Sequence, residues 1–199
     1  MDKKYLDLFN VQEGQLREVL EIALHRGGDY ADLYFEYTVS NELSLRDGEV
    51  NAVSSNIDYG VGIRVVSGDK TGFAFTEQTT LAEMKNAARI AAQIATLPDS
   101  VTNIPAAFTP VKGTNYSPIL SPWEDHTVTE KMGWLTSLNE KVFAKDSRIT
   151  KVLERLTDSN TKILFYNSLG ESLTDERPMA ALVVTCVMEG NGRIESASS

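Results

Sequence analysis

One stretch of the sequence, residues 60–76, constrains the fold more than any other. Two runs of alternating apolar side chains flank the short turn segment Ser67-Gly-Asp-Lys70. Alternation with a period of two predicts strands, and a loop at Gly68-Asp69, or one of four residues from Ser67, joins them as an antiparallel hairpin. In that register Arg64 lies opposite Phe73 on one side of the hairpin. The segment therefore predicts two paired strands with one unusual face.

This face of the hairpin carries glycine, arginine and phenylalanine, without a nucleophile or a metal ligand. Such a face suits an extended peptide or a partner subunit, and Arg64 is placed for a cation–π contact with Phe73. The alternative is that Arg64 only extends along the margin of the sheet. The residues that we expect to contact a substrate or a subunit are Arg64, Asp69, Lys70 and Phe73.

The elements around the hairpin predict an α+β fold, with an antiparallel sheet and helices packed on it. Apolar residues at helical spacing predict a helix over 11–26 that ends at Gly27-Gly28. A capping box, Thr80-Leu-Ala-Glu83, predicts the start of a second helix with an alanine-rich buried stripe. Alternating or aromatic runs predict strands over 31–37, 42–46 and 49–57, with a hairpin turn at Asp47-Gly48.

Residues 98–122 divide the chain, because five of its six prolines fall there. Proline excludes a regular helix or a central strand, so we expect an extended connector. The predicted organisation is an N-terminal α+β domain over 1–97, the connector over 98–122, and a second α+β unit over 123–199. The second unit is smaller, and its sheet is predicted to be incomplete.

The second unit begins with another capping box, Thr127-Val-Thr-Glu130, which predicts a helix. Its expected buried face is Val128, Met132, Leu135, Leu138 and Val142. Three strands should follow, at 148–157, 163–167 and 179–188, with a turn at 158–160 between the first two. The segment Glu189-Gly-Asn-Gly192 predicts a reversal into one more strand.

Charge and composition narrow the class of protein. The chain has 199 residues and a net charge of −9, and its pI is near 4.8. This charge repels phosphate backbones, so we expect no direct binding to nucleic acid. The N-terminus is charged, so we expect no signal peptide. The sequence has no uncharged apolar run of about 18 residues, so we also expect no membrane-spanning helix. We therefore expect a cytoplasmic protein that does not contact membranes.

Candidate catalytic and metal-ligating residues are few. The single cysteine, Cys186, lies in an apolar run and is expected to be a buried hydrophobic residue. His25 is expected at the end of a helix, where a cation favours the dipole. His126 follows Trp123-Glu-Asp, a cluster that is either a loop before a helix or a weak metal site. None of the known metal or nucleophile spacings is present, so we assign no catalytic and no metal residue.

Several segments of the sequence, in the same order along the chain, nevertheless resemble one family. The hairpin at 60–76, followed by an alanine-rich helix, resembles the N-terminal part of the TldD/PmbA zinc metallopeptidases, the modulator of DNA gyrase family. The Gly-Asp-Lys-Thr-Gly-Phe form resembles the TldD branch. Further matching pieces occur in order: Gly28-Asp-Tyr-Ala-Asp-Leu-Tyr-Phe-Glu36, Leu45-Arg-Asp-Gly-Glu-Val50, Lys141-Val-Phe-Ala-Lys145 and Tyr166-Asn-Ser-Leu-Gly170.

This resemblance implies a peptidase that acts on unfolded or peptide substrates as a dimer with a homologous subunit. The family's zinc motif, His-Glu-x-x-x-His, belongs to a C-terminal domain, and neither His25 nor His126 begins it here. We therefore expect an N-terminal portion that is inactive alone, with zinc only in a full-length member. The competing hypothesis is a non-catalytic partner that regulates a peptidase subunit.

Overall fold

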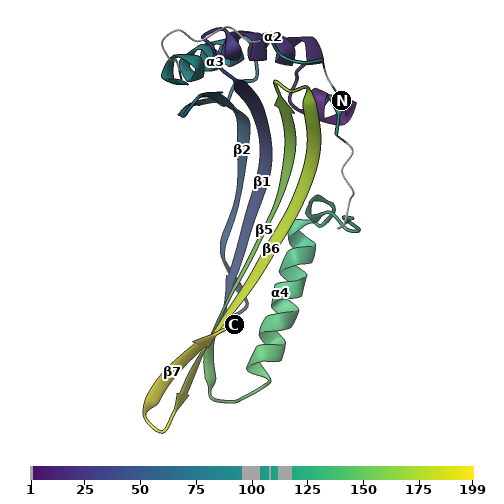
Figure 1. The fold of residues 1–199 in the computed structure, drawn as a ribbon. Coiled ribbons are helices and arrows are strands. Elements are labelled where there is room, and N and C mark those ends of the chain that lie inside the picture. Colours follow the sequence, from purple (N-terminus) through teal and green to yellow (C-terminus); the bar gives the residue numbers. More distant parts are fainter. Residues whose placement is uncertain (1, 96–103, 108, 112–117) are drawn as a thin grey trace. The chain divides into compact units, whose positions relative to one another are not determined.

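The protein is described by a computed structural model that covers residues 2–95, 104–107, 109–111 and 118–199. Its helices are α1 (Lys3–Leu8), α2 (Glu13–Leu24), α3 (Leu81–Ala95), the short 3-10 helix η1 (Trp123–Asp125) and α4 (Val128–Phe143). Its strands are β1 (Tyr30–Arg46), β2 (Glu49–Ser67), β3 (Lys70–Thr76), β4 (Thr109–Pro110), β5 (Ile149–Asn167), β6 (Glu171–Gly190) and β7 (Arg193–Ser198), as Figure 1 shows.

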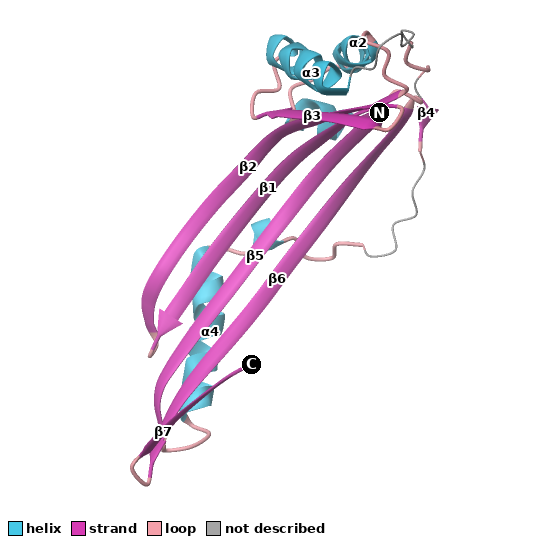
Figure 2. Cartoon of the chain, turned by 60° about the vertical axis from the view of Figure 1, so that its left-hand side comes forward, coloured by secondary structure: helices cyan, strands magenta, loops and turns pink. Residues whose placement is uncertain are grey.

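The strands form one sheet in the order β3-β2-β1-β5-β6-β4, and β7 also pairs with β6 (Figure 2). The pairs β2–β3 and β6–β7 are antiparallel, whereas the two-residue strand β4 runs parallel to β6. Helices pack on this sheet, so the predicted α+β class is confirmed. Strand β4 belongs to the proline-rich connector, and many residues of 98–122 lie outside the described part of the chain.

The chain divides into two compact units, each built from three segments. Unit 1 comprises residues 1–37, 58–116 and 161–176, and unit 2 comprises residues 38–57, 117–160 and 177–199. The predicted boundaries 1–97, 98–122 and 123–199 remain a prediction.

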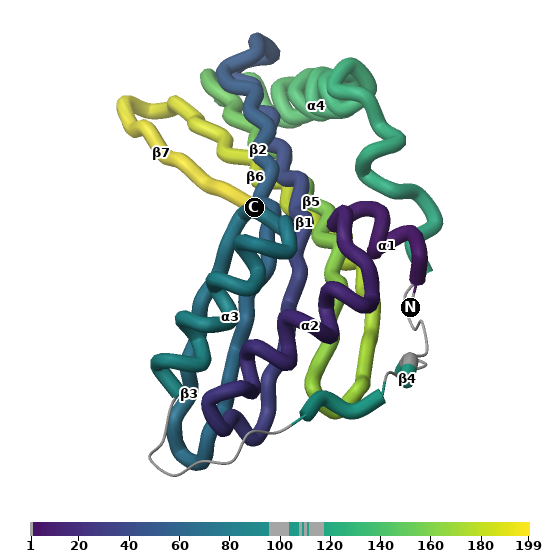
Figure 3. Tube along the Cα trace, turned by 90° about the horizontal axis from the view of Figure 1, so that it is seen from above, coloured from purple at the N-terminus to yellow at the C-terminus, as the bar shows by residue number. Residues whose placement is uncertain are grey.

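In unit 1, helices α2 and α3 cover one face of the strands (Figure 3). The expected alanine-rich stripe of α3 is confirmed, since Met84, Ala88, Ala91 and Ala95 are all buried. Small side chains let the helix approach β3 closely: a Cβ added at Gly72 would lie 1.9 Å from the carbonyl oxygen of Ala91. The sequence therefore needs glycine at position 72 for the close packing of α3 on β3, and not for a turn.

In unit 2, helix α4 begins at the predicted capping box, in which the Glu130 N–H donates to Thr127 Oγ1 and the Thr127 N–H donates to Glu130 Oε2. The predicted buried face was right in part: Leu135 is buried, Met132, Leu138 and Val142 are half-buried, and only Val128 is exposed. The buried residues of the helix are Lys131, Leu135 and Asn139, and Val128 is 53% exposed. Asp158 on β5 gives Lys131 a buried partner, so polar side chains join the apolar ones on the buried side of α4.

Several strands are longer than predicted. Strand β1 continues through 38–41, β2 joins the runs at 49–57 and 60–67, and β5 continues through the predicted turn at 158–160. The turn prediction failed because Asp158 and Asn160 are buried within β5 and have partners there. Asp158 accepts hydrogen bonds from Asn41 and Lys131, and Asn160 donates to Glu124. Helix α1 was not predicted.

The predicted turns at Asp47-Gly48 and Asn191-Gly192 are confirmed. Both residues of each turn have positive φ (54° and 82°, 51° and 75°). This is the type I′ geometry that joins two twisted strands, and Asp-Gly and Asn-Gly adopt it readily. Strand β7, expected after residue 192, pairs with residues 185–190 of β6 in antiparallel orientation.

Candidate contact surface

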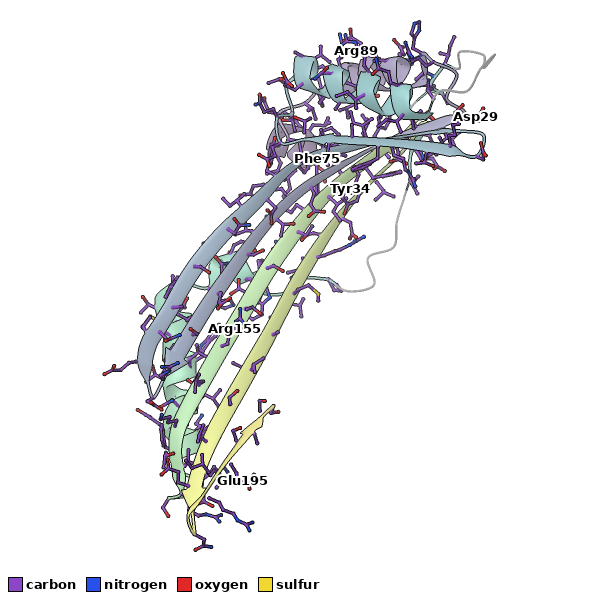
Figure 4. The ribbon with its side chains drawn as sticks, turned by 90° about the vertical axis from the view of Figure 1, so that its left-hand side faces the viewer. Asp29, Tyr34, Phe75, Arg89, Arg155 and Glu195 are labelled. Carbon is purple, nitrogen blue, oxygen red and sulfur yellow. The ribbon has the colours of Figure 1, made fainter. Side chains whose placement is uncertain are left out.

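The candidate surface is the face of the β2–β3 hairpin that points away from α2 and α3. The register is the predicted one, with Arg64 opposite Phe73 and Gly62 opposite Phe75. Ile63 and Val65 point into the core of unit 1, so their neighbours Gly62 and Arg64 point outward. Figure 4 shows Phe75 and Tyr34 on this outward side, with Arg89 on the far side of α3.

Arg64 is fixed by an acidic residue of the neighbouring strand. Its Nε and Nη2 atoms donate to Asp32 Oδ2 at 2.9 and 2.5 Å, and the Asp32 carboxylate is buried. The hydrogen bonds to Asp32 raise the pKa of Arg64. The cation–π contact of Arg64 is with Tyr30 and not with the predicted Phe73: the guanidinium carbon lies 5.8 Å from the centroid of the Tyr30 ring.

The ring of Phe73 lies over Gly62 because this glycine has no side chain. A Cβ at Gly62 would lie 3.0 Å from Phe73 Cε2, so the ring extends across the glycine. Phe73 is 57% exposed and Phe75 is 71% exposed. Two adjacent aromatic side chains of β3 are thus available to solvent on this face, beside the ordered Arg64.

A polar network continues from Arg64 across the sheet. Burial raises the pKa of the Tyr30 hydroxyl, which interacts with both Asp32 and Asn167. The Asn167 amide nitrogen donates to Glu171 at 2.7 Å, and its oxygen accepts the backbone N–H groups of Leu169 and Glu171. Asp32 was not predicted as a site residue. Its signal is a lone acid between the buried residues Ala31 and Leu33.

The other two predicted contact residues, Asp69 and Lys70, lie at the hairpin turn. Ser67 pairs with Lys70, so Gly68-Asp69 is the two-residue loop that was predicted, and Gly68 has φ +58°. The Gly68 N–H donates to Asp29 Oδ2 at 2.7 Å, which ties the turn to the start of β1. The structure brings Arg64 and Phe73 together and leaves Asp69 and Lys70 three register positions away.

The histidines and the cysteine do not form a reactive cluster. His25 caps the C-terminal end of α2. His126 precedes α4, where Nε2 lies 2.8 Å from Ser121 Oγ and the ring packs between Trp123 and Trp134. Cys186 is only partly buried, contrary to expectation, because its strand lies away from the two apolar clusters.

Within the described residues, no group of three or more His, Cys, Asp or Glu side chains is arranged to hold a metal ion. The side chains of these residues therefore do not fit a zinc site. None of the described helices combines the length and hydropathy needed to cross a membrane.

Comparison with known proteins identifies the family. The model of PmbA/TldA metallopeptidase domain 1 matches residues 31–95, and the model of the central domain of the same family matches residues 121–199. The chain belongs to the PmbA/TldD metallopeptidase family. It is 33% identical over 189 residues to the metalloprotease TldD homolog of Haemophilus influenzae, and 30% identical over 171 residues to that of Buchnera aphidicola subsp. Schizaphis graminum.

The chain is shorter than these relatives. The first match covers 95% of this chain and 39% of the relative, and the second covers 86% and 35%. Solved structures share the fold. A putative modulator of a DNA gyrase from Thermotoga maritima aligns with a TM-score of 0.70 at 20% identity, over 94% of this chain and 42% of that one. TldE from Thermococcus kodakarensis aligns with a TM-score of 0.66 at 15% identity, over 93% and 42%.

Proposed function

We propose that this chain is the N-terminal portion of a TldD-like zinc-dependent peptidase that acts on unfolded or peptide substrates. In this proposal it supplies surface for the substrate channel and for contact with a homologous subunit, in a homodimer or a heterodimer. The zinc site belongs to a part of the full-length family member outside these 199 residues. A cytoplasmic location, without direct contact to nucleic acid or membranes, is part of the proposal.

The observation that supports a contact role is the outward face of the β2–β3 hairpin. Phe73 and Phe75 are more than half exposed there, although large aromatic side chains usually gain from burial. Beside them Arg64 is half exposed and held by the buried Asp32. Ordered aromatic and arginine side chains are the residue types that most often anchor protein and peptide ligands.

The test is binding of a labelled, permanently unfolded polypeptide, such as reduced and carboxymethylated α-lactalbumin, to the purified 199-residue chain. Fluorescence anisotropy should show that F73A/F75A weakens binding by roughly tenfold, because two anchor side chains are lost. The matched control is I90A/I94A. It removes two exposed apolar side chains from α3, on the opposite side, and should leave the affinity unchanged.

Equal effects of the two double variants would contradict the proposed surface. The purified chain should also hold no stoichiometric zinc and cleave no peptide. Cleavage that a chelator abolishes would contradict the proposal that the zinc site lies outside these 199 residues. Tight binding to a homologous subunit without any peptide binding would instead favour the alternative, a non-catalytic regulatory partner of a peptidase subunit.

A further inference from the structure

Glu154 is the most deeply buried acid of unit 2. It lies on β5 and is 1% exposed, and neither carboxyl oxygen has a hydrogen-bond partner among the described residues. A buried polar group without a partner costs free energy, and an ionised one costs far more. Glu154 takes no part in the contact surface described above, so its burial needs a separate explanation.

A second buried group without a hydrogen-bond partner lies on α4, and the packing of this helix on β5 indicates where. Lys131 Nζ contacts Asp158 Oδ2 at 2.7 Å, and Leu135 packs with Leu156. Four residues along a helix advance about 6 Å, and two residues along a strand advance about 6.7 Å. Every fourth residue of α4 therefore stays level with every second residue of β5. The next pair in this series is Asn139 with Glu154.

Asn139 is 6% exposed, and its amide nitrogen also lacks a hydrogen-bond partner. The position of its oxygen agrees with the series. A Cβ at Gly48 would lie 3.3 Å from Asn139 Oδ1, and the adjacent Asp47 exchanges hydrogen bonds of 2.9 Å with Val152, two residues before Glu154. An unpartnered amide and an unpartnered carboxyl group thus lie at one buried interface, and no hydrogen bond joins the Asn139 amide nitrogen to Glu154 in this structure.

We propose that Glu154 and Asn139 form a proton-operated latch that holds the C-terminal half of α4 on the sheet. A carboxylic acid and a primary amide can form a ring of two hydrogen bonds: the acid O–H donates to Asn139 Oδ1, and Asn139 Nδ2 donates to the acid carbonyl. Loss of the proton removes one donor and places a carboxylate against Oδ1. The latch then opens.

No charged group on the packed elements replaces the proton. On α4 and β5, Lys131 and Asp158 bind one another, and Arg155 points to the other side of its strand, where it pairs with Glu42. From the β1–β2 turn, the Asp47 carboxylate accepts the Val152 N–H. The other charged side chains nearby are exposed: Arg46, Glu49, Glu140 and Lys141. Burial raises the pKa of Glu154 to about 7, so the latch would operate near neutral pH.

Hydrogen exchange followed by mass spectrometry tests the latch on the whole chain. We expect the protection factors of residues 138–144, corrected for the intrinsic exchange rate, to fall roughly tenfold between pH 5.5 and 8.5. Residues 129–134, held by the Lys131–Asp158 pair, should keep theirs. In E154Q the amide cannot ionise, so the fall should disappear, whereas the exposed control E140Q should behave like the wild type.

Constant protection of residues 138–144 in the wild-type chain would overturn the proposal without reference to any variant. The proposal would also fail if E154Q showed the same loss of protection with pH as the wild type. N139L supplies an independent measurement. It removes the amide partner, and it should reduce the protection of residues 138–144 at pH 5.5 to near the wild-type level at pH 8.5.

Discussion

Helices α3 and α4 both pack on strands, but with opposite chemistry. The buried side of α3 is a stripe of alanines and one methionine, fitted to β3 by the absence of a side chain at Gly72. The buried side of α4 carries Lys131, Leu135 and Asn139. In unit 1 the interface between α3 and β3 therefore depends on close contact between backbones, whereas in unit 2 the interface of α4 relies on a small leucine cluster and a buried ion pair.

This difference determines which kind of change each unit tolerates. A close-packed interface is sensitive to added volume, since neighbouring atoms have nowhere to move. A buried polar interface is sensitive to the loss of one partner, because the other is left without compensation. Single substitutions can therefore test whether the two helices are held in these two ways.

The largest effect should come from Lys131→Met. The substitution leaves Asp158 buried without its cation and should lower the free energy of unfolding by about 3–5 kcal/mol. Urea unfolding followed by tryptophan fluorescence suits this test, because both tryptophans of the chain, Trp123 and Trp134, lie in unit 2. The double variant K131M/D158L should recover most of the loss. A double variant as unstable as K131M would contradict the interpretation.

A slightly smaller loss is expected in unit 1 for Gly72→Ala. The added methyl group would meet the backbone of α3 at Ala91, so the helix must shift, at a cost of about 3 kcal/mol. The matched control is Gly133→Ala, which has open space around it and should stabilise α4 by up to about 1 kcal/mol. Thermal unfolding followed by circular dichroism compares the two; equal melting temperatures would show that α3 is not held by close contact.

The third prediction concerns the pH dependence of unit 2. Burial raises the folded-state pKa of Glu154 from 4.5 to about 7, so the folded state binds this proton more tightly than the unfolded state. Its contribution to stability is complete below pH 4.5 and declines as the pH rises towards 7. The stability of E154Q relative to the wild type should increase by about 2 kcal/mol between pH 5.5 and 8.5. Urea unfolding at both pH values measures it; a constant difference would contradict it.

Much of unit 1 could be predicted from the sequence because local rules and tertiary packing agree there. The hairpin register followed from the alternation at 60–76 and the Gly68-Asp69 loop, and the stripe of α3 followed from its alanines. For the contact surface, the positions of Arg64 and Phe73 were predicted, but the role of Asp32 was not. Its partner lies on another strand, 32 residues away, and no local pattern identifies such a pair.

Unit 2 was predicted less well, for a physical reason. Periodicity identifies a buried face from its apolar residues, and two of the three fully buried residues of α4, Lys131 and Asn139, are polar. The segment with Asp158 and Asn160 predicts a turn, because Asp and Asn side chains favour turns. Within β5 they are buried with partners on α4, β1 and η1. These partners come from distant segments, so their effect appears only in three dimensions.

The smallest effect should come from Arg155→Ala, on the same strand as Asp158. Arg155, which is labelled in Figure 4, pairs with Glu42 at 2.5 Å, whereas the buried Lys131–Asp158 pair is 2.7 Å long. However, the Arg155 side chain is 59% exposed, so water and salt screen its charge and replace its hydrogen bonds. R155A should therefore unfold at the same urea concentration as the wild type, at low and at high salt. A loss comparable to that of K131M would show that distance rather than burial determines the strength of these pairs, and the contrast drawn between the two helices would no longer hold.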